Sequence, residues 1–269
     1  MTMSDEMTAV AALRSELDRP IYNRIIKRNV GEGELDYERY VRTPELLSLQ
    51  PGPDHLVSSD ELMFLMVHQA QEIWLKLTAH ELAGLVGSLD RDDAWTASAH
   101  LSRAVRVIDC LVREIKVLET LTPDSYQVIR RNLGNGSGQE SPGYNQVNLA
   151  ASYVGAALDR LADSRGIELA EVYGPENEHP DLKHLVELLV DFDEGYQLWL
   201  VQHFMLVRRT IGVSRDTAAL DGIPTTVLPA RMTQPLFRRL WKLREEMTAG
   251  WKRGAGYAPG ASREDAVRG

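Results

Sequence analysis

One histidine lies on the apolar stripe of a long expected helix, a setting in which it can do chemistry. His203 falls at helical spacing with four large side chains, those of Phe192, Tyr196, Trp199 and Leu206. A neutral imidazole held among such residues can bind a metal or a haem iron through a ring nitrogen. A histidine that only makes a hydrogen bond inside a core gives the same pattern. The spacing alone therefore leaves both interpretations open.

Two further polar residues precede a glycine-rich segment. Tyr126 and Arg130 lie one helical turn apart, just before Gly134-Asn135-Gly136-Ser137-Gly138, so both side chains can point at one site. The planar guanidinium of an arginine suits a carboxylate, and a flexible loop can wrap a ligand. The loop is no phosphate cradle, because it lacks the Gly-Lys-Ser/Thr ending and follows no strand. A surface salt bridge is the alternative interpretation of Arg130.

Paired Glu-x-x-His motifs would instead indicate a di-iron site in a helical bundle. The single such motif runs from Glu176 to His179, and prolines flank it on both sides, so it belongs to a loop. Within one expected helix, His68 and Glu72 lie at i and i+4, and His80 follows. Such a pair is more often structural than metal-binding.

The composition limits the class of protein. With 269 residues, 43% of them hydrophobic, the chain can build a substantial core. A net charge of -9 argues against a nucleic-acid partner, and the pairs Arg208-Arg209 and Arg238-Arg239 are expected on solvated helix faces. The single cysteine, Cys110, excludes an intramolecular disulfide and a cysteine-rich metal site. No signal peptide or membrane-spanning run is visible, so we expect a soluble, cytoplasmic protein.

The apolar residues recur at helical rather than strand spacing, which predicts an all-α fold. Ser58 or Ser59 is expected to cap the first long helix. Residues 1–35 are expected to form an arm that docks on a neighbouring subunit, residues 36–250 a single helical domain, and residues 251–269 a disordered tail. The predicted helices cover residues 9–17, 37–47, 60–88, 92–121, 126–133, 149–161, 181–210 and 235–247.

Several ordered blocks of the sequence resemble one family, the haem-dependent tryptophan 2,3-dioxygenases. The longest reads Asp-Glu-Leu-Met-Phe-Leu-Met-Val-His-Gln-Ala-Gln-Glu-Ile-Trp-Leu-Lys-Leu from Asp60. The other matching blocks are residues 35–41, 46–50, 117–123, 126–138 and 197–203. This resemblance implies a helical bundle that encloses a b-type haem, with dioxygen as co-substrate.

The resemblance also implies roles for particular residues. His203 matches the proximal histidine that holds the haem iron, and Arg130 matches the arginine that binds the substrate carboxylate. Tyr126 supports that arginine, whereas Ser137 and Gly138 lie over the haem and the substrate. The remaining implied substrate contacts are Thr217, which matches a threonine that contacts the substrate ammonium, and Tyr37, Tyr40 and Val41.

Those last three residues match an arm that reaches into a neighbouring subunit's pocket. A homotetramer with shared N-terminal arms is therefore implied. For Tyr37, Tyr40 and Val41 the alternative is ordinary interface packing.

The sequence also departs from the family pattern. Ser59 stands where the family has a histidine that hydrogen-bonds the indole nitrogen, directly before the Asp-Glu pair. The family's Phe-Gln-Ser run reads Gln139-Glu140-Ser141, and the arginine usual a few residues later is missing. An outer helical portion before the proximal helix is absent as well. The altered run changes the edge of the proposed haem site.

These departures favour mono-oxygenation at indole C2 over ring opening, with Ser59 as the residue that differs at the reacting centre. The chain then looks like divergent members of maremycin-type antibiotic pathways, which turn tryptophan or β-methyltryptophan into 2-oxindoles and need an external reductant. Opening of the C2–C3 bond to N-formylkynurenine is the alternative. A non-catalytic haem-binding sensor is the second alternative.

Overall fold

The computed structural model describes residues 3–17, 28, 33, 35–220, 222–250 and 260, and the regular elements within them are helices. Strands are absent from this part of the chain, where Ala218 and Pro224 form an isolated antiparallel bridge. The predicted all-α class is therefore confirmed. None of the described helices is long and apolar enough to cross a membrane.

The chain divides into two compact units, Met1–Gly52 and Pro53–Gly269. The first contains α1 (Met3–Leu17), α3 (Asp36–Val41) and α4 (Thr43–Leu47), so the predicted helix over residues 37–47 is in fact two short ones. Arg42, with a left-handed φ of 58°, separates α3 from α4. The predicted domain boundaries at residues 35 and 250 stay predictions, and most of residues 18–34 and 251–269 lies outside the described residues.

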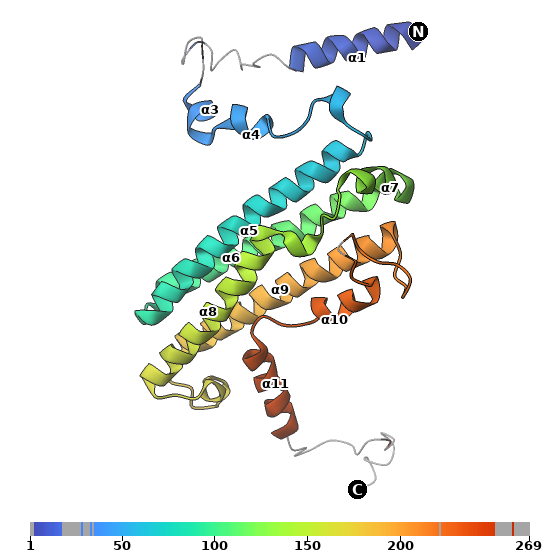
Figure 1. Ribbon diagram of the computed structural model, residues 1–269. Helices are drawn as coiled ribbons and strands as arrows, with labels where there is room; N and C mark the ends of the chain where they lie inside the picture. Colours follow the sequence, from blue (N-terminus) through green and yellow to red (C-terminus); the bar gives the residue numbers. More distant parts are fainter. Residues whose placement is uncertain are drawn as a thin grey trace, which may run out of the picture. The chain divides into compact units, whose positions relative to one another are not determined.

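Four long helices form the bundle of the second unit (Figure 1). They are α5 (Glu61–Asp90), α6 (Ala94–Glu114), α8 (Pro142–Arg165) and α9 (Pro180–Thr210). α6 packs along both α5 and α9, and α8 packs along α5. One face of each helix buries leucine, isoleucine, valine and alanine in a common core. Burial of this apolar surface is the main force that holds the bundle together.

Shorter elements connect and cover the bundle. They are η1 (Pro53–His55), η2 (Ile115–Thr120), α7 (Pro123–Asn132), η3 (Gly138–Glu140), η4 (Leu169–Tyr173), η5 (Thr225–Val227), α10 (Leu228–Met232) and α11 (Arg238–Gly250). The predicted helix over 92–121 was too long, because its last part is the tighter helix η2. The predicted helix over 149–161 was too short, because Ser141 caps α8 and accepts a hydrogen bond from the Tyr144 amide at 3.0 Å.

The expected cap on α5 was wrong. Asp60 occupies the N-cap position and makes no side-chain cap bond. The Glu61 side chain instead points back toward the preceding turn, where its carboxylate accepts a hydrogen bond from the Val57 amide at 2.6 Å. The Ser58 hydroxyl is 2.8 Å from the hydroxyl of Ser125 on α7, so it links the start of α5 to α7.

A fully buried carboxylate fixes the last helix to the bundle. Asp193 of α9 accepts hydrogen bonds from the backbone amides of Leu236 and Phe237, each at 3.0 Å, and from the Trp241 indole at 2.8 Å. Gln197 donates a fourth bond at 3.1 Å. Because a buried charge needs such partners, Asp193 determines how the chain turns into α11.

Candidate functional site

His203 lies near the end of α9, on the stripe predicted from the sequence, in which Phe192, Tyr196 and Trp199 are buried. Burial and, to a lesser degree, the nearby His68 lower the pKa of His203 to about 4. The imidazole is therefore neutral near pH 7, with a free electron pair on one nitrogen. No hydrogen bond joins this ring to another part of the chain that the structure describes. A neutral imidazole without a described partner is able to bind a metal.

An aromatic group on α5 and α7 lies close to this histidine. The rings of Phe64 and His68 are 4.2 Å apart between centroids, and the ring of Tyr126 is 6.1 Å from that of Phe64. His68 Nδ1 is 2.7 Å from the carbonyl oxygen of Phe64, one turn earlier on the helix. These three rings form one apolar wall, and His68 within it is close enough to His203 to lower the pKa of that residue.

The glycine-rich loop contacts His203 directly. A Cβ atom added at Gly138 would lie 3.6 Å from Nε2 and 3.7 Å from Cε1 of His203. Ser137 caps η3, and its hydroxyl accepts from the Gln139 amide at 3.2 Å. Gly134, with a φ of 60°, provides a backbone conformation that other residues rarely adopt. Gly138 therefore lies beside His203 in the structure.

Glu72 holds this loop in place. Its carboxylate accepts from the Ser141 hydroxyl and, at 3.0 Å, from the Gly143 amide at the start of α8. A Cβ atom at Gly143 would be 2.5 Å from Leu75 Cβ, so α8 begins directly against α5. The negative charge also suits the positive end of the α8 dipole. The i,i+4 pattern with His68 had singled out Glu72, but the partner it bonds lies on another element.

Arg130 contacts the segment around Thr217. The Arg130 guanidinium donates to the carbonyl oxygen of Ala218 at 2.9 Å. Thr217 precedes Ala218, and its hydroxyl is 2.8 Å from that of Ser214. Burial raises the pKa of Tyr126, although the charge of Arg130 opposes the shift, so the phenol stays protonated. Arg130 makes no ion pair with any described carboxylate, so its charge remains available to an anion.

The remaining predicted site residues lie on two other segments. Ser59 is exposed in the turn before α5, with no hydrogen bond to a described residue. Tyr37 (67% exposed), Tyr40 (92%) and Val41 (41%) lie on α3 in the other unit. Their proposed places in a substrate pocket stay predictions.

The sequence did not predict one buried contact, which involves a residue about one helical turn before His203 on α9. The Trp199 indole donates to Gln71 Oε1 at 3.3 Å, and the Gln71 amide nitrogen is buried without a partner in the described structure. A buried donor without an acceptor is costly and uncommon. Nothing in the spacing of a lone glutamine could have indicated it.

The fold and this group of residues define an all-α protein in which His203 lies beside a glycine loop and Arg130 makes no ion pair with a described carboxylate. The family model described as tryptophan 2,3-dioxygenase matches residues 25–152, a range that includes Arg130 and Gly138 but not His203. The chain is similar to this family over that range.

Several curated proteins named tryptophan 2,3-dioxygenase are similar to this chain over most of their length. The protein from Erythrobacter litoralis is 29% identical, over 78% of this chain and 98% of its own. The protein from Cupriavidus necator is 28% identical, over 80% and 88%, and that from Herpetosiphon aurantiacus is 26% identical, over 79% and 98%. These names favour ring opening, the alternative interpretation of the sequence, over oxindole formation.

Proposed function

We propose that this chain is a haem-dependent oxygenase that opens the indole ring of tryptophan between C2 and C3. The relatives carry the name of that activity. The observation that carries the proposal is His203, a neutral and unpartnered imidazole beside an apolar wall and a glycine loop. When bound, the haem supplies the redox chemistry that activates dioxygen.

The donor set fits a haem with one axial histidine. A neutral nitrogen is what an iron needs, and the pKa of about 4 keeps His203 unprotonated at any physiological pH. Gly138 lies so close to Nε2 that even an added methyl group would touch the ring. A haem on His203 therefore requires the loop to lie further out, and the glycines at 134, 136 and 138 make that movement easy.

The remaining residues would bind and orient the amino acid. Arg130 has free N–H donors for a carboxylate, and its bond to Ala218 fixes the direction of the guanidinium. Thr217 lies beside that contact and presents a hydroxyl near the same position. The Ser137–Gly138 segment would cover the ligand, and Glu72 bonds Ser141 and Gly143, which follow that segment. Fixing the head of the substrate in this way brings the indole close to the reacting centre.

Mono-oxygenation at C2 is the second candidate. Its basis is Ser59, whose hydroxyl is shorter than the histidine side chain that the family has at this position. Ser59 is exposed and has no described partner, so it is free to turn toward a ligand. This reaction would need an external reductant, whereas ring opening incorporates both oxygen atoms and needs none.

We also propose that the protein assembles as a homotetramer in which the arm of one protomer completes the pocket of another. Tyr37, Tyr40 and Val41 are apolar or aromatic and exposed, which fits residues that are covered on assembly. Light scattering of the purified chain tests this, and a monomer that turns over tryptophan would contradict it.

An absorption spectrum followed by product analysis tests the function. We expect a Soret band in the wild-type protein, tryptophan-dependent oxygen uptake and a product that gains two labelled atoms from ¹⁸O₂. One labelled atom in a 2-oxindole would overturn ring opening in favour of the second candidate. A Soret band without oxygen uptake would indicate a haem-binding sensor instead.

Two variants of Ser59 separate the roles of the position. Ser59→Ala removes the hydroxyl, and Ser59→His restores the family's usual residue. If Ser59 directs the outcome, the product ratio should change in Ser59→His and not merely the rate. Equal product ratios in all three proteins would show that this position is not the switch.

A further inference from the structure

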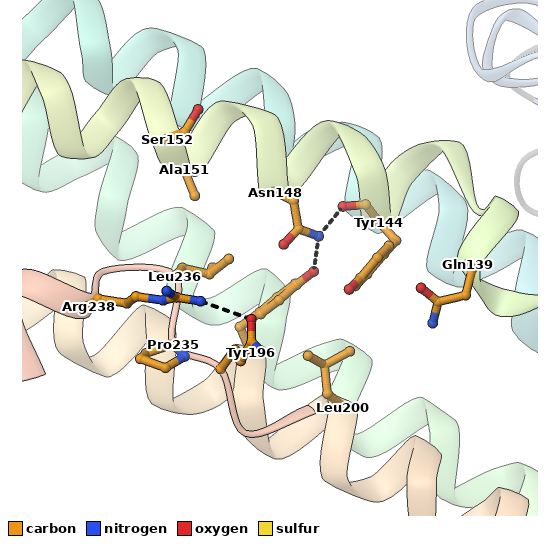
Figure 2. A pocket seen from close by; sticks show the side chains of 11 residues that line it. Gln139, Tyr144, Asn148, Ala151, Ser152, Tyr196, Leu200, Pro235, Leu236 and Arg238 are labelled. Atoms are coloured by element: carbon orange, nitrogen blue, oxygen red, sulfur yellow. Dashed lines mark hydrogen bonds between the residues drawn. The ribbon is translucent and has the colours of Figure 1, made fainter. Parts of the chain in front are cut away.

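A pocket of about 340 Å³ lies between α8, α9 and the turn that leads into α11 (Figure 2). Its walls include Tyr144, Asn148, Tyr196, Leu200 and Arg238, and none of the residues assigned above to the substrate or the iron lines it. Tyr196 and Leu200 precede His203 on the same stripe of α9, so the pocket begins about two helical turns or less from that histidine. Its volume is that of a small-molecule site.

A buried hydroxyl in this pocket lacks an acceptor. Tyr196 is 1% exposed, and its oxygen accepts a hydrogen bond from Asn148 Nδ2 at 2.9 Å. The other amide hydrogen of Asn148 is donated to the Tyr144 carbonyl at 2.8 Å, which fixes the orientation of the amide. Burial raises the pKa of the Tyr196 hydroxyl, so the phenol keeps its proton. No described residue accepts that proton, so the donor is available to a ligand.

The pocket also has a positive charge without a counter-ion. Arg238 donates to the neutral amide oxygen of Gln234 at 2.9 Å and makes no ion pair within the described chain. The next residue, Arg239, is different, because it pairs with Asp159 and lies 3.7 Å from Glu168. No aspartate or glutamate lines the pocket. A guanidinium and a hydroxyl donor with no local anion form a site for an acidic group.

We propose that this pocket binds a carboxylate, with Arg238 and Tyr196 as the donors and Leu200 and Leu236 against the hydrocarbon part of the molecule. Two kinds of molecule can supply this carboxylate. One is a propionate of a haem held by His203, which rests on the proposed function. The other is a free small carboxylic acid, which does not.

The test uses the full-length protein as purified, the variants Arg238→Gln and Tyr196→Phe, and Arg239→Gln as the matched control. In one arm, absorbance follows the loss of haem from each protein to excess apomyoglobin. In the other, calorimetry measures the binding of 3-phenylpropionate. Circular dichroism shows whether each variant is folded, and Arg238→Gln changes an exposed side chain that the core does not need.

In at least one arm, we expect Arg238→Gln and Tyr196→Phe each to weaken binding about tenfold, because each removes a donor to a charged group. Arg239→Gln should match the wild type. Faster haem loss alone assigns the site to a propionate, and loss of 3-phenylpropionate binding assigns it to a free acid. If neither variant differs from Arg239→Gln in either arm, the proposal is wrong. A chain that carries no haem contradicts the proposed function, and calorimetry alone then decides on the pocket.

Discussion

The two ends of the helical bundle differ in packing although the same helices build both. In α5, the buried residues begin at Gln71 and run to Leu89, and none lies in the first ten residues of the helix. In α9, the buried residues run from Leu182 to Leu200, after which only Thr210 is buried. One end of the bundle is thus a closed core. The other end carries His203, Arg130 and the glycine loop.

The open end exposes several apolar side chains. They include Met66, Val201 and Met205. Exposed apolar groups of this kind mark surfaces that a ligand or a partner covers. The difference teaches that the packed end supplies the stability of the chain, so the open end can keep an unpaired histidine and an uncovered loop.

Removal of core volume at the packed end should have the largest effect on stability. Leu82 is fully buried, and Leu82→Ala should lower the free energy of unfolding by about 2–5 kcal/mol, through lost burial and the cavity left behind. Met66→Ala, on the same helix at the open end, is the control and should change it by less than about 0.5 kcal/mol. Urea denaturation measures both. Equal losses would erase the proposed difference between the ends.

Glu81, a buried carboxylate at the packed end, should make the free energy of unfolding depend on pH. Burial alone would raise the pKa of Glu81, but hydrogen bonds from Arg103 and His100, each at 2.8 Å, lower it below its ordinary value of 4.5. The stabilisation is therefore complete above about pH 5 and is lost as the pH falls through the lowered pKa. Glu81→Gln should cost about 1–3 kcal/mol at pH 7 and progressively less below pH 4.5.

Urea denaturation of wild type and Glu81→Gln from pH 7 to pH 3 measures this dependence. A difference between the two proteins that stays constant down to pH 3 would show that the Glu81 charge does not contribute.

At the open end, Glu72→Gln should affect the site more than the fold. The amide keeps the size of the side chain but loses the charge that the Ser141 hydroxyl and the Gly143 amide bond to, so unfolding should become easier by about 0.5–1.5 kcal/mol. Loss of haem to apomyoglobin should speed up, because the loop over His203 is less firmly held. Glu119→Gln changes an exposed glutamate and serves as control. An unchanged rate of haem loss would remove Glu72 from the site.

The sequence predicted the packed end better than the open one. Apolar spacing located α5 and α9 to within two residues at each end, because burial on one face of a helix leaves a periodic trace. It misplaced the end of α6, where the chain tightens into η2, and the start of α8, which Ser141 caps. Apolar spacing records neither feature.

At the site, helical spacing singled out His203 and the pair Tyr126 and Arg130, and the roles of these residues stay predictions. Contacts between distant segments left no such trace. The bonds of Glu72 to the start of α8 and of Trp199 to Gln71 depend on how helices cross, so they required the three-dimensional structure.

The variant His203→Ala tests the difference between the two ends most directly. His203 makes no hydrogen bond to the described chain, so the haem-free variant should keep the unfolding free energy of haem-free wild type to within about 0.5 kcal/mol. Its absorption spectrum should lack the Soret band or show it shifted and weakened. An unchanged Soret band, or a variant that no longer folds, would contradict a histidine kept for iron rather than for the core.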